Sequence, residues 1–413
     1  MVELAHPLIV PLPRLVPPAG QLLRWAALHR LRATWSGPRL ELELRSGELV
    51  QLGAGAAPAA RATIHDDRLF LRMLLRGEMG AGESFVAGEW SSDDLVATVR
   101  AFITGTGARG FESRLTRLAQ LPALVRHRRA ANSRTGSERN IHAHYDLGNA
   151  FYRLFLDPET LSYSCGLFSR DAGASELAAA QHAKHERLCE LLALDATDHL
   201  LEVGCGWGGM ALHAARTRGC RVTAITVSRE QHELATARVA AAGLADRIAI
   251  EYRDYRELAG TFTKIVSIEM LEAVGYEFLP GFFKTLARAL APGGRIALQS
   301  ITMPDDRFAA YRTRVDWMQT YIFPGSCIPS LAAIRAALAP SGLAITRADD
   351  IGPDYAPTLR IWRERFVAEL AAVRALGFDE PFIRTWLLYL AFSEAAFAER
   401  TLGDHQFVLA RAS

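Results

Sequence analysis

The chain has 413 residues, half of them hydrophobic, and its 47 Lys and Arg against 45 Asp and Glu give a formal net charge of +2. This near balance excludes an overall electrostatic attraction to nucleic acid, so no nucleic-acid partner is expected, and the apolar content excludes a disordered chain. The five cysteines include no CxxC pair, which favours a reducing, cytoplasmic compartment. The apolar stretch 8–16 is too short to span a membrane.

The first 105 residues predict a small α+β domain. Residues 40–44 alternate strictly between Leu and Glu, and residues 62–64 form a second short apolar run, so both are expected to be strands. Helical spacing covers 69–75 and 93–102. The glycine-rich stretch 79–83 between them is expected to be a connection.

An arginine-rich segment follows, at 106–138. Eight arginines and only two glutamates lie between positions 109 and 139. Two interpretations remain open: a solvated interdomain helix and linker, or a surface that contacts phospholipid headgroups.

The catalytic part is expected at 139–413, where apolar strands alternate with helices. Alternation of this kind predicts an α/β fold with a parallel sheet. The last two of the expected strands could be added at the edge. The expected strands are 200–203, 221–227, 248–252, 265–268, 296–301, 343–346 and 406–410.

The first of these strands runs into the glycine-rich loop Gly204-Cys205-Gly206-Trp207-Gly208-Gly209. Glycines let a backbone turn tightly and approach a ligand. A dinucleotide site would need an acidic residue after the next strand, where this chain has Thr226-Val227-Ser228. Glu202 and Asp254 instead stand where S-adenosylmethionine (AdoMet) methyltransferases of this fold place acidic residues. The loop therefore predicts AdoMet as cofactor.

Other polar and aromatic groups suggest chemistry. Glu269 and Glu272 follow the fourth strand, at the edge where open α/β sheets bind ligands. Residues 163–165 are interpreted as a loop over the cofactor, with core packing as the alternative for Cys165. His142, His144 and Asp146 lack further ligands at metal spacing, so no metal is predicted. The aromatic stretch 307–328 is either core or the wall of an apolar tunnel.

These motifs resemble cyclopropane-fatty-acyl-phospholipid synthases. The resemblance covers the chain from about residue 137 to the end, and less specifically the first 105 residues through 82–85 and 88–90. It implies a Rossmann-like class I AdoMet methyltransferase sheet with helical acyl-binding insertions. The matching segments are 141–149, 161–165, 202–209, 269–275 and 321–325.

The resemblance also implies a reaction. The double bond of an unsaturated phospholipid acyl chain takes the methyl group of AdoMet, and bound bicarbonate removes a proton from the resulting carbocation to close a cyclopropane ring. The implied bicarbonate site consists of Cys165, Glu272, Gln299, the backbone of Ile301, and Tyr355. The implied cofactor residues are Tyr163, Ser164, Gly204, Gly206, Thr226, Gln231 and Asp254.

Two positions depart from the commoner bacterial pattern, because Gln299 and Ala273 stand where that pattern has histidine. They resemble a plant-like branch, in which a neutral amide would donate to bicarbonate. The product stays open between a cyclopropane and a methyl- or methylene-branched chain. Two other functions stay open as well: a small-molecule N-methyltransferase and a non-catalytic lipid-binding protein. The implied protein is cytoplasmic, attached peripherally to the inner face of the membrane, with a homodimer possible.

Overall fold

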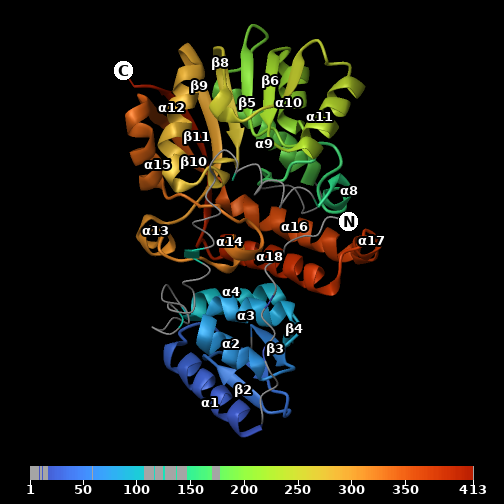
Figure 1. Ribbon diagram of the computed structural model, residues 1–413, viewed down its shortest axis with the longest axis vertical. Coiled ribbons are helices and arrows are strands. Elements are labelled where there is room, and N and C mark those ends of the chain that lie inside the picture. Colours follow the sequence, from blue (N-terminus) through green and yellow to red (C-terminus); the bar gives the residue numbers. More distant parts are fainter. Residues whose placement is uncertain are drawn as a thin grey trace.

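The computed structural model describes residues 17–57, 59–106, 147–169 and 177–412, together with the isolated positions 9, 12, 116, 124, 125 and 136. It contains two sheets that lie at opposite ends of an elongated molecule, with a layer of helices between them (Figure 1). The predicted arginine-rich segment and the trio His142, His144 and Asp146 fall almost entirely outside the described residues.

The N-terminal unit is a four-stranded sheet covered by four helices. Its strand order is β2-β1-β3-β4, in which β1 and β3 are parallel and the outer pairs are antiparallel. The strands expected at 40–44 and 62–64 and the two expected helices are confirmed. The elements are α1 (Pro17–Thr34), β1 (Leu40–Glu43), β2 (Leu49–Leu52), β3 (Ala60–Ile64), α2 (Arg68–Arg76), α3 (Glu78–Val86), β4 (Trp90–Ser92) and α4 (Leu95–Thr106).

The expectation that 79–83 is a connection is wrong, because these residues lie inside α3. The glycines allow close packing rather than a turn. A Cβ atom at Gly80 would lie 2.2 Å from the backbone oxygen of Arg72, and one at Gly82 would lie 2.6 Å from Cδ1 of Trp317. Absence of a side chain therefore lets α3 contact α2 on one side and the catalytic part on the other.

The large sheet has seven strands in the order β10-β11-β9-β8-β5-β6-β7. The strands from β5 to β9 run parallel, which confirms the predicted α/β class, and β11 is antiparallel to both of its neighbours. The segment 406–410 is thus an inner strand and not an edge strand. The strands are β5 (His199–Val203), β6 (Arg221–Thr226), β7 (Ile248–Tyr252), β8 (Phe262–Ile268), β9 (Leu290–Thr302), β10 (Leu343–Asp350) and β11 (Gly403–Arg411).

Helices cover both faces of this sheet. Leu200 and Val222 point to the core beneath α9 (Leu177–Leu192) and α10 (Gly209–Arg218), whereas Leu201 and Ile265 point to the core beneath α12 (Leu279–Ala289) and α15 (Leu331–Leu338). The helix α11 (Arg229–Ala241) joins β6 to β7. The strand order reverses at β5, and open α/β sheets bind ligands at such a point.

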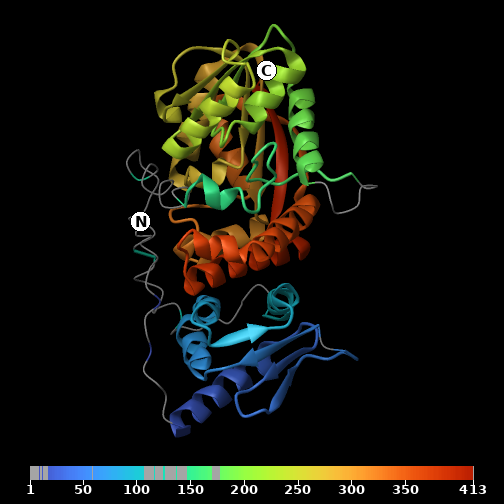
Figure 2. The same cartoon turned by 90° about the vertical axis from the view of Figure 1, so that its right-hand side faces the viewer.

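The layer between the two sheets consists mainly of α16 (Tyr355–Ala368) and α18 (Glu380–Ala398), as the side view shows (Figure 2). Arg384 of α18 donates hydrogen bonds to the backbone oxygens of Phe85 and Trp90, at 2.5 and 2.8 Å. Four shorter helices adjoin this layer: α8 (Asn149–Tyr152), α13 (Asp305–Tyr311), α14 (Trp317–Tyr321) and α17 (Leu370–Ala375). Among the described residues, none of the helices has the length and apolar character needed to cross a bilayer.

The aromatic stretch 307–328 supplies most of α13 and all of α14, and its aromatic side chains are buried or partly buried. Trp317 is 9% exposed, and the hydroxyl of Tyr321 donates to Glu83 of the N-terminal unit at 2.7 Å. These contacts favour the core interpretation over the tunnel wall for the part of the stretch that meets α3.

Candidate active site

A cavity of about 160 Å³ opens at the carboxyl ends of β5, β6 and β8. The structure brings all seven residues that the resemblance implied for the cofactor to this one cavity. Strand ends at the switch point explain the convergence, because parallel strands direct their following loops to one edge. The seven lining residues are Tyr163, Ser164, Gly204, Gly206, Thr226, Gln231 and Asp254.

The glycine-rich loop lines the cavity. Gly204 and Gly206 have φ angles of +80° and +53°, which a side chain would strain. A Cβ atom at Gly204 would also lie 3.0 Å from the side chain of Met270. Glycine is therefore needed for its conformation at both positions, and for space as well at Gly204.

Glu202 lies at the end of β5, is 3% exposed and lines the same cavity. Burial raises the pKa of its carboxyl to about 8. Its Oε2 atom has no hydrogen-bond partner among the described residues. A buried acceptor without a partner is costly, and a ligand hydroxyl would satisfy it, so the cavity fits the ribose of AdoMet.

The far side of the cavity holds residues already fixed by local hydrogen bonds. Thr226 donates its hydroxyl to the side-chain oxygen of Gln231 at 2.8 Å. Asp254 accepts the backbone N–H of Arg256 at 2.9 Å and thereby begins a short 3₁₀ helix. These side chains are positioned before any ligand enters.

The loop 163–165 at the cavity is held by side chains of two helices, α18 and α9. The hydroxyl of Tyr163 lies 2.7 Å from that of Tyr389 on α18. The Oγ atom of Ser164 accepts a hydrogen bond from Lys184 at 2.7 Å. Lys184 is completely buried, and this burial lowers its pKa to about 8. Sequence reasoning missed Lys184, because a lysine in an amphipathic helix is usually exposed.

Glu269 follows β8 and lines the cavity. Its φ angle of +47° is uncommon for a residue with a side chain, and such strain occurs chiefly at functional sites. Its Oε1 atom accepts from the backbone N–H of Cys165 and from the side-chain amide of Gln299, both at 2.8 Å. Its Oε2 atom accepts the hydroxyl of Tyr355 at 2.6 Å.

The donors around Glu269 are themselves buried. Burial raises the pKa of the Tyr355 phenol well above its ordinary value, so the phenol keeps its proton and donates. The thiol of Cys165 likewise has a pKa raised well above the usual range by burial, and its Sγ atom faces the backbone oxygen of Gly166 at 3.2 Å. Cys165 therefore contributes its backbone N–H and not a thiolate.

Two buried side chains of β11 complete this network. Gln406 donates to the side-chain oxygen of Gln299 at 3.0 Å, and the amide nitrogen of Gln299 donates to Asp404 at 3.0 Å. Burial and the charge of Glu269 raise the pKa of Asp404 well above its ordinary value. Sequence reasoning missed both β11 residues, although two polar residues two apart on an apolar strand are a signal for a buried polar network.

Glu272 has separate partners. Its Oε1 atom accepts the hydroxyl of Ser300 at 2.9 Å and the backbone N–H of Ile301. Burial, and then the charge of Glu269, raise its pKa to about 8. The five residues of the implied bicarbonate site are thus divided: three surround Glu269, and Ile301 binds Glu272.

The comparisons with known proteins identify the chain. The family description "Mycolic acid cyclopropane synthetase" matches residues 132–407. The chain belongs to this family. It is accordingly an AdoMet-dependent methyltransferase of the cyclopropane synthase type, with the class I methyltransferase fold.

Some relatives match nearly the whole chain. The tuberculostearic acid methyltransferase of Mycobacterium tuberculosis is 40% identical over 400 residues, covering 95% of this chain and 91% of the relative. The cyclopropane-fatty-acyl-phospholipid synthase of Escherichia coli K12 is 33% identical over 374 residues, covering 90% and 92%. A mycolic acid cyclopropane synthase solved with S-adenosylhomocysteine and CTAB is 30% identical with a TM-score of 0.60, covering 66% and 97%.

The fit of the two implied cofactors differs. The orphaned Oε2 atom of Glu202 and the open glycine loop fit AdoMet. Bicarbonate does not fit the arrangement described, because the donors of Cys165, Gln299 and Tyr355 are already bound to the carboxylate of Glu269.

Proposed function

We propose that this methyltransferase methylates the cis double bond of an unsaturated acyl chain carried on a phospholipid. The family and two near full-length relatives, which are named for fatty acids or fatty acyl phospholipids, support a lipid substrate. The observation that carries the proposal is the position of Glu269, whose partly buried carboxylate lines the same cavity as the Gly204–Gly206 loop. A methyl donor and a proton acceptor would thus share one cavity.

The proposed chemistry needs both features. Bound AdoMet would supply a methyl group from its sulfonium sulfur, and the sulfur would keep the electron pair of the broken C–S bond. The π electrons of the double bond would form the new C–C bond, which leaves a carbocation on the other alkene carbon. The protein must then hold a base near the methyl carbon and exclude water, which would trap the cation. On one side of the cavity Tyr163 packs against the buried side chains of Trp362 and Tyr389, which would help to exclude water.

We propose a methylene-branched chain as the product. The support is the 40% identity, over 95% of this chain, to a relative that is named as a methyltransferase and not as a cyclopropane synthase. A hydride shift moves the cation to the carbon that carries the new methyl group, and loss of a methyl proton then gives an exocyclic C=C bond. A cyclopropane is the second candidate, favoured by the 33% identity to the bacterial synthase over 90% of the chain.

Product analysis tests the proposal. Purified protein, AdoMet and vesicles of a dioleoyl phospholipid are expected to yield acyl chains heavier by one CH₂ per double bond modified. Proton NMR then separates exocyclic methylene protons from ring protons. Absence of any lipid product, together with methylation of a soluble amine, would instead favour an N-methyltransferase. Binding of AdoMet and lipid without turnover would favour a non-catalytic protein.

The place of action is proposed from the same substrate. A cytoplasmic protein that modifies phospholipid must reach the inner surface of the membrane. We propose that the arginine-rich segment contributes, since clustered arginines attract anionic headgroups. Replacing Arg126, Arg128 and Arg129 with glutamine should weaken binding to anionic vesicles more at low salt than at high salt. If the variant bound the vesicles as tightly as the wild type at both salt concentrations, this role would be contradicted.

A further inference from the structure

The first inference concerns the base of the proposed reaction and rests on the proposed function. Glu269 is held by three donors that come from distant parts of the chain: the backbone of Cys165, the side chain of Gln299 and the side chain of Tyr355. Together these donors fix both oxygens of the Glu269 side chain in place. These are three of the groups that the family resemblance assigns to bicarbonate.

A carboxylate side chain can replace bicarbonate because both contain a planar CO₂⁻ group whose two oxygens accept hydrogen bonds. We propose that the carboxylate of Glu269 is the base of this enzyme, and that its reaction requires no bicarbonate. In this step the C–H bond of the transferred methyl carbon breaks. Its electron pair forms the final C–C or C=C bond, and the proton passes to an oxygen of Glu269. Release of that proton to water completes the cycle.

The structure distinguishes Glu269 from the neighbouring Glu272. Glu269 lines the cofactor cavity, whereas Glu272 is not among the residues that line it. Only the first carboxylate of the pair is therefore in place to meet a methyl group in the cavity.

The strained backbone at Glu269 has a purpose in this account. Its N–H donates to the backbone oxygen of Gln299 at 2.7 Å while φ is +47°. A left-handed conformation is unfavourable for a residue with a side chain and persists only where the surroundings enforce it. Here the conformation holds the carboxylate against its three donors.

The test compares bicarbonate dependence in three proteins. Wild-type turnover in buffer freed of CO₂ is expected to stay unchanged when bicarbonate is added. Glu269→Gln is expected to lose at least ~100-fold in kcat, as removal of general-base machinery usually does, and to keep AdoMet binding by calorimetry. Glu269→Gly relieves the backbone strain and leaves space among the three donors of Cys165, Gln299 and Tyr355. Added bicarbonate should therefore restore part of the turnover of this variant.

Glu364→Gln serves as the matched control, because Glu364 is an exposed carboxylate on α16. Bicarbonate-dependent turnover of the wild type, or normal turnover of Glu269→Gln, would overturn the assignment. Failure of the wild type to modify any lipid, with or without bicarbonate, would overturn the proposed function instead. AdoMet binding shows in each case whether the variant has folded.

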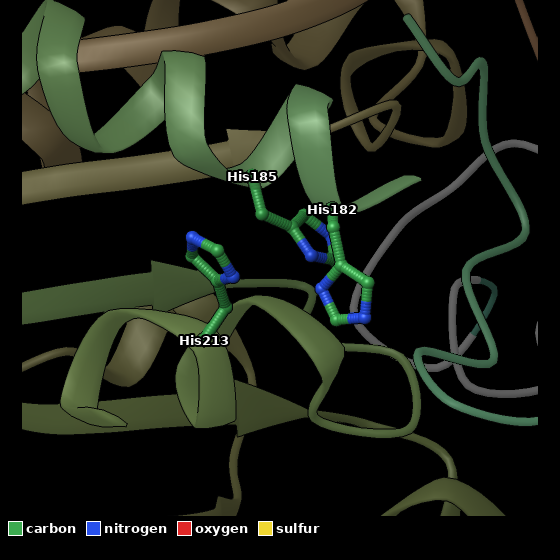
Figure 3. A group of neighbouring side chains, drawn as sticks. All are labelled: His182, His185 and His213. Carbon is green, nitrogen blue, oxygen red and sulfur yellow. The ribbon is translucent and has the colours of Figure 1, made fainter. Parts of the chain in front are cut away.

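A second inference rests on three histidines behind the cavity. His182 and His185 lie on α9 and His213 lies on α10, and Figure 3 shows their rings facing one another. One ring nitrogen of each lies within 4.8 Å of one from each of the others. Imidazole nitrogens that converge in this way are typical zinc ligands.

The surroundings of these rings resemble those of bound metal ligands. His182 contacts Glu159 at 2.9 Å and His213 contacts Glu186 at 3.0 Å, each through Nε2. Metal-binding histidines usually hold a carboxylate through the second ring nitrogen. The Nδ1 atom of His185 is buried and has no hydrogen-bond partner among the described residues.

We infer that His182, His185 and His213 bind one divalent transition-metal ion, such as Zn²⁺. The ion would link α9 to α10 next to the cofactor cavity, because His185 lines the cavity and its Nε2 lies 3.3 Å from Oγ of Ser162 in the covering loop. This role is structural, since the proposed chemistry places no reacting atom there.

Metal titration tests the second inference. Protein dialysed against EDTA is expected to bind one Zn²⁺ by calorimetry and to give a Co²⁺ absorption spectrum. His213→Gln should lose both signals, whereas His232→Gln, on α11 away from the trio, should keep them. No binding by the wild type, or equal binding by His213→Gln, would overturn the site. Thermal unfolding without metal shows whether each variant folds.

Discussion

Gln406 donates a hydrogen bond from its side-chain amide to the side-chain oxygen of Gln299, at 3.0 Å, across the β9–β11 pair. This bond fixes which end of the Gln299 amide faces Glu269. The oxygen of Gln299 is taken by Gln406, so its NH₂ group donates to the carboxylate. Gln299 thus donates to Glu269 while it accepts from Gln406.

Gln406→Met tests this positioning role. Without the donor, the Gln299 amide can turn its oxygen toward Glu269, and the loss of one buried hydrogen bond costs ~1 kcal/mol. We expect kcat to fall by about 5-fold, which is that energy converted, with AdoMet affinity unchanged. The discriminating measurement is the isotope effect with methyl-deuterated AdoMet, which should increase if proton removal has become slower. A fall in kcat with an unchanged isotope effect would contradict a role at the proton-transfer step.

The buried carboxyl of Glu202 should make cofactor binding depend on pH. Burial raises the pKa of Glu202 to about 8, so the free protein holds its proton at pH 7. A cationic ligand and its ribose hydroxyls favour the ionised carboxylate, so binding should release close to one proton, and affinity should rise as pH increases toward 8. Calorimetry in buffers of different ionisation enthalpy measures the release. Glu202→Gln should abolish it; release that persists in this variant would assign the proton to another group.

Glu272 predicts how stability depends on pH. Its folded-state pKa of about 8 lies above the ordinary value of 4.5, so the folded protein binds the extra proton between these values. Stability from this group is complete below pH 4.5 and is lost as the pH rises toward 8, at up to about 1.4 kcal/mol per pH unit. Glu272→Gln should flatten urea-unfolding stability between pH 5 and 8. A slope equal to that of the wild type would contradict the assignment.

Gly82 predicts sensitivity at the contact between the N-terminal unit and the catalytic part. A Cβ atom there would lie 2.6 Å from Trp317, and overpacking of this kind usually costs about 1–3 kcal/mol. Gly82→Ala should lower the thermal midpoint. Gly281→Ala on α12 is the control, because a Cβ atom at Gly281 meets nothing within 4 Å and a helical alanine is favourable. Equal midpoints for the two variants would contradict tight packing at Gly82.

Periodicity predicted the central strands well, since β7 begins and ends at the predicted residues and β5, β6 and β8 differ from prediction only at their ends. It failed at α3, because glycine signals a turn locally but serves here to admit Arg72 and Trp317 from distant elements. Local patterns also could not predict the inner position of β11, because this position depends on pairing with β9, which lies about a hundred residues earlier in the chain.

Those parts of the site that belong to a local sequence motif could be predicted. The glycine loop and Glu202 follow from a strand running into glycines, and the structure places them at the cavity. The partners of Glu269 could not be derived locally, because Cys165, Gln299 and Tyr355 meet it only when three separate segments pack together. Sequence reasoning placed Glu269 at a ligand-binding edge, but it assigned the surrounding donors to bicarbonate.

The most direct test of the account is one reaction with methyl-deuterated AdoMet and unsaturated phospholipid in buffer freed of CO₂. The account predicts acyl chains that gain CD₂, because one deuteron is lost to Glu269 without help from bicarbonate. Acyl chains that gain CD₂ only after bicarbonate is added, or that retain all three deuterons, would contradict it.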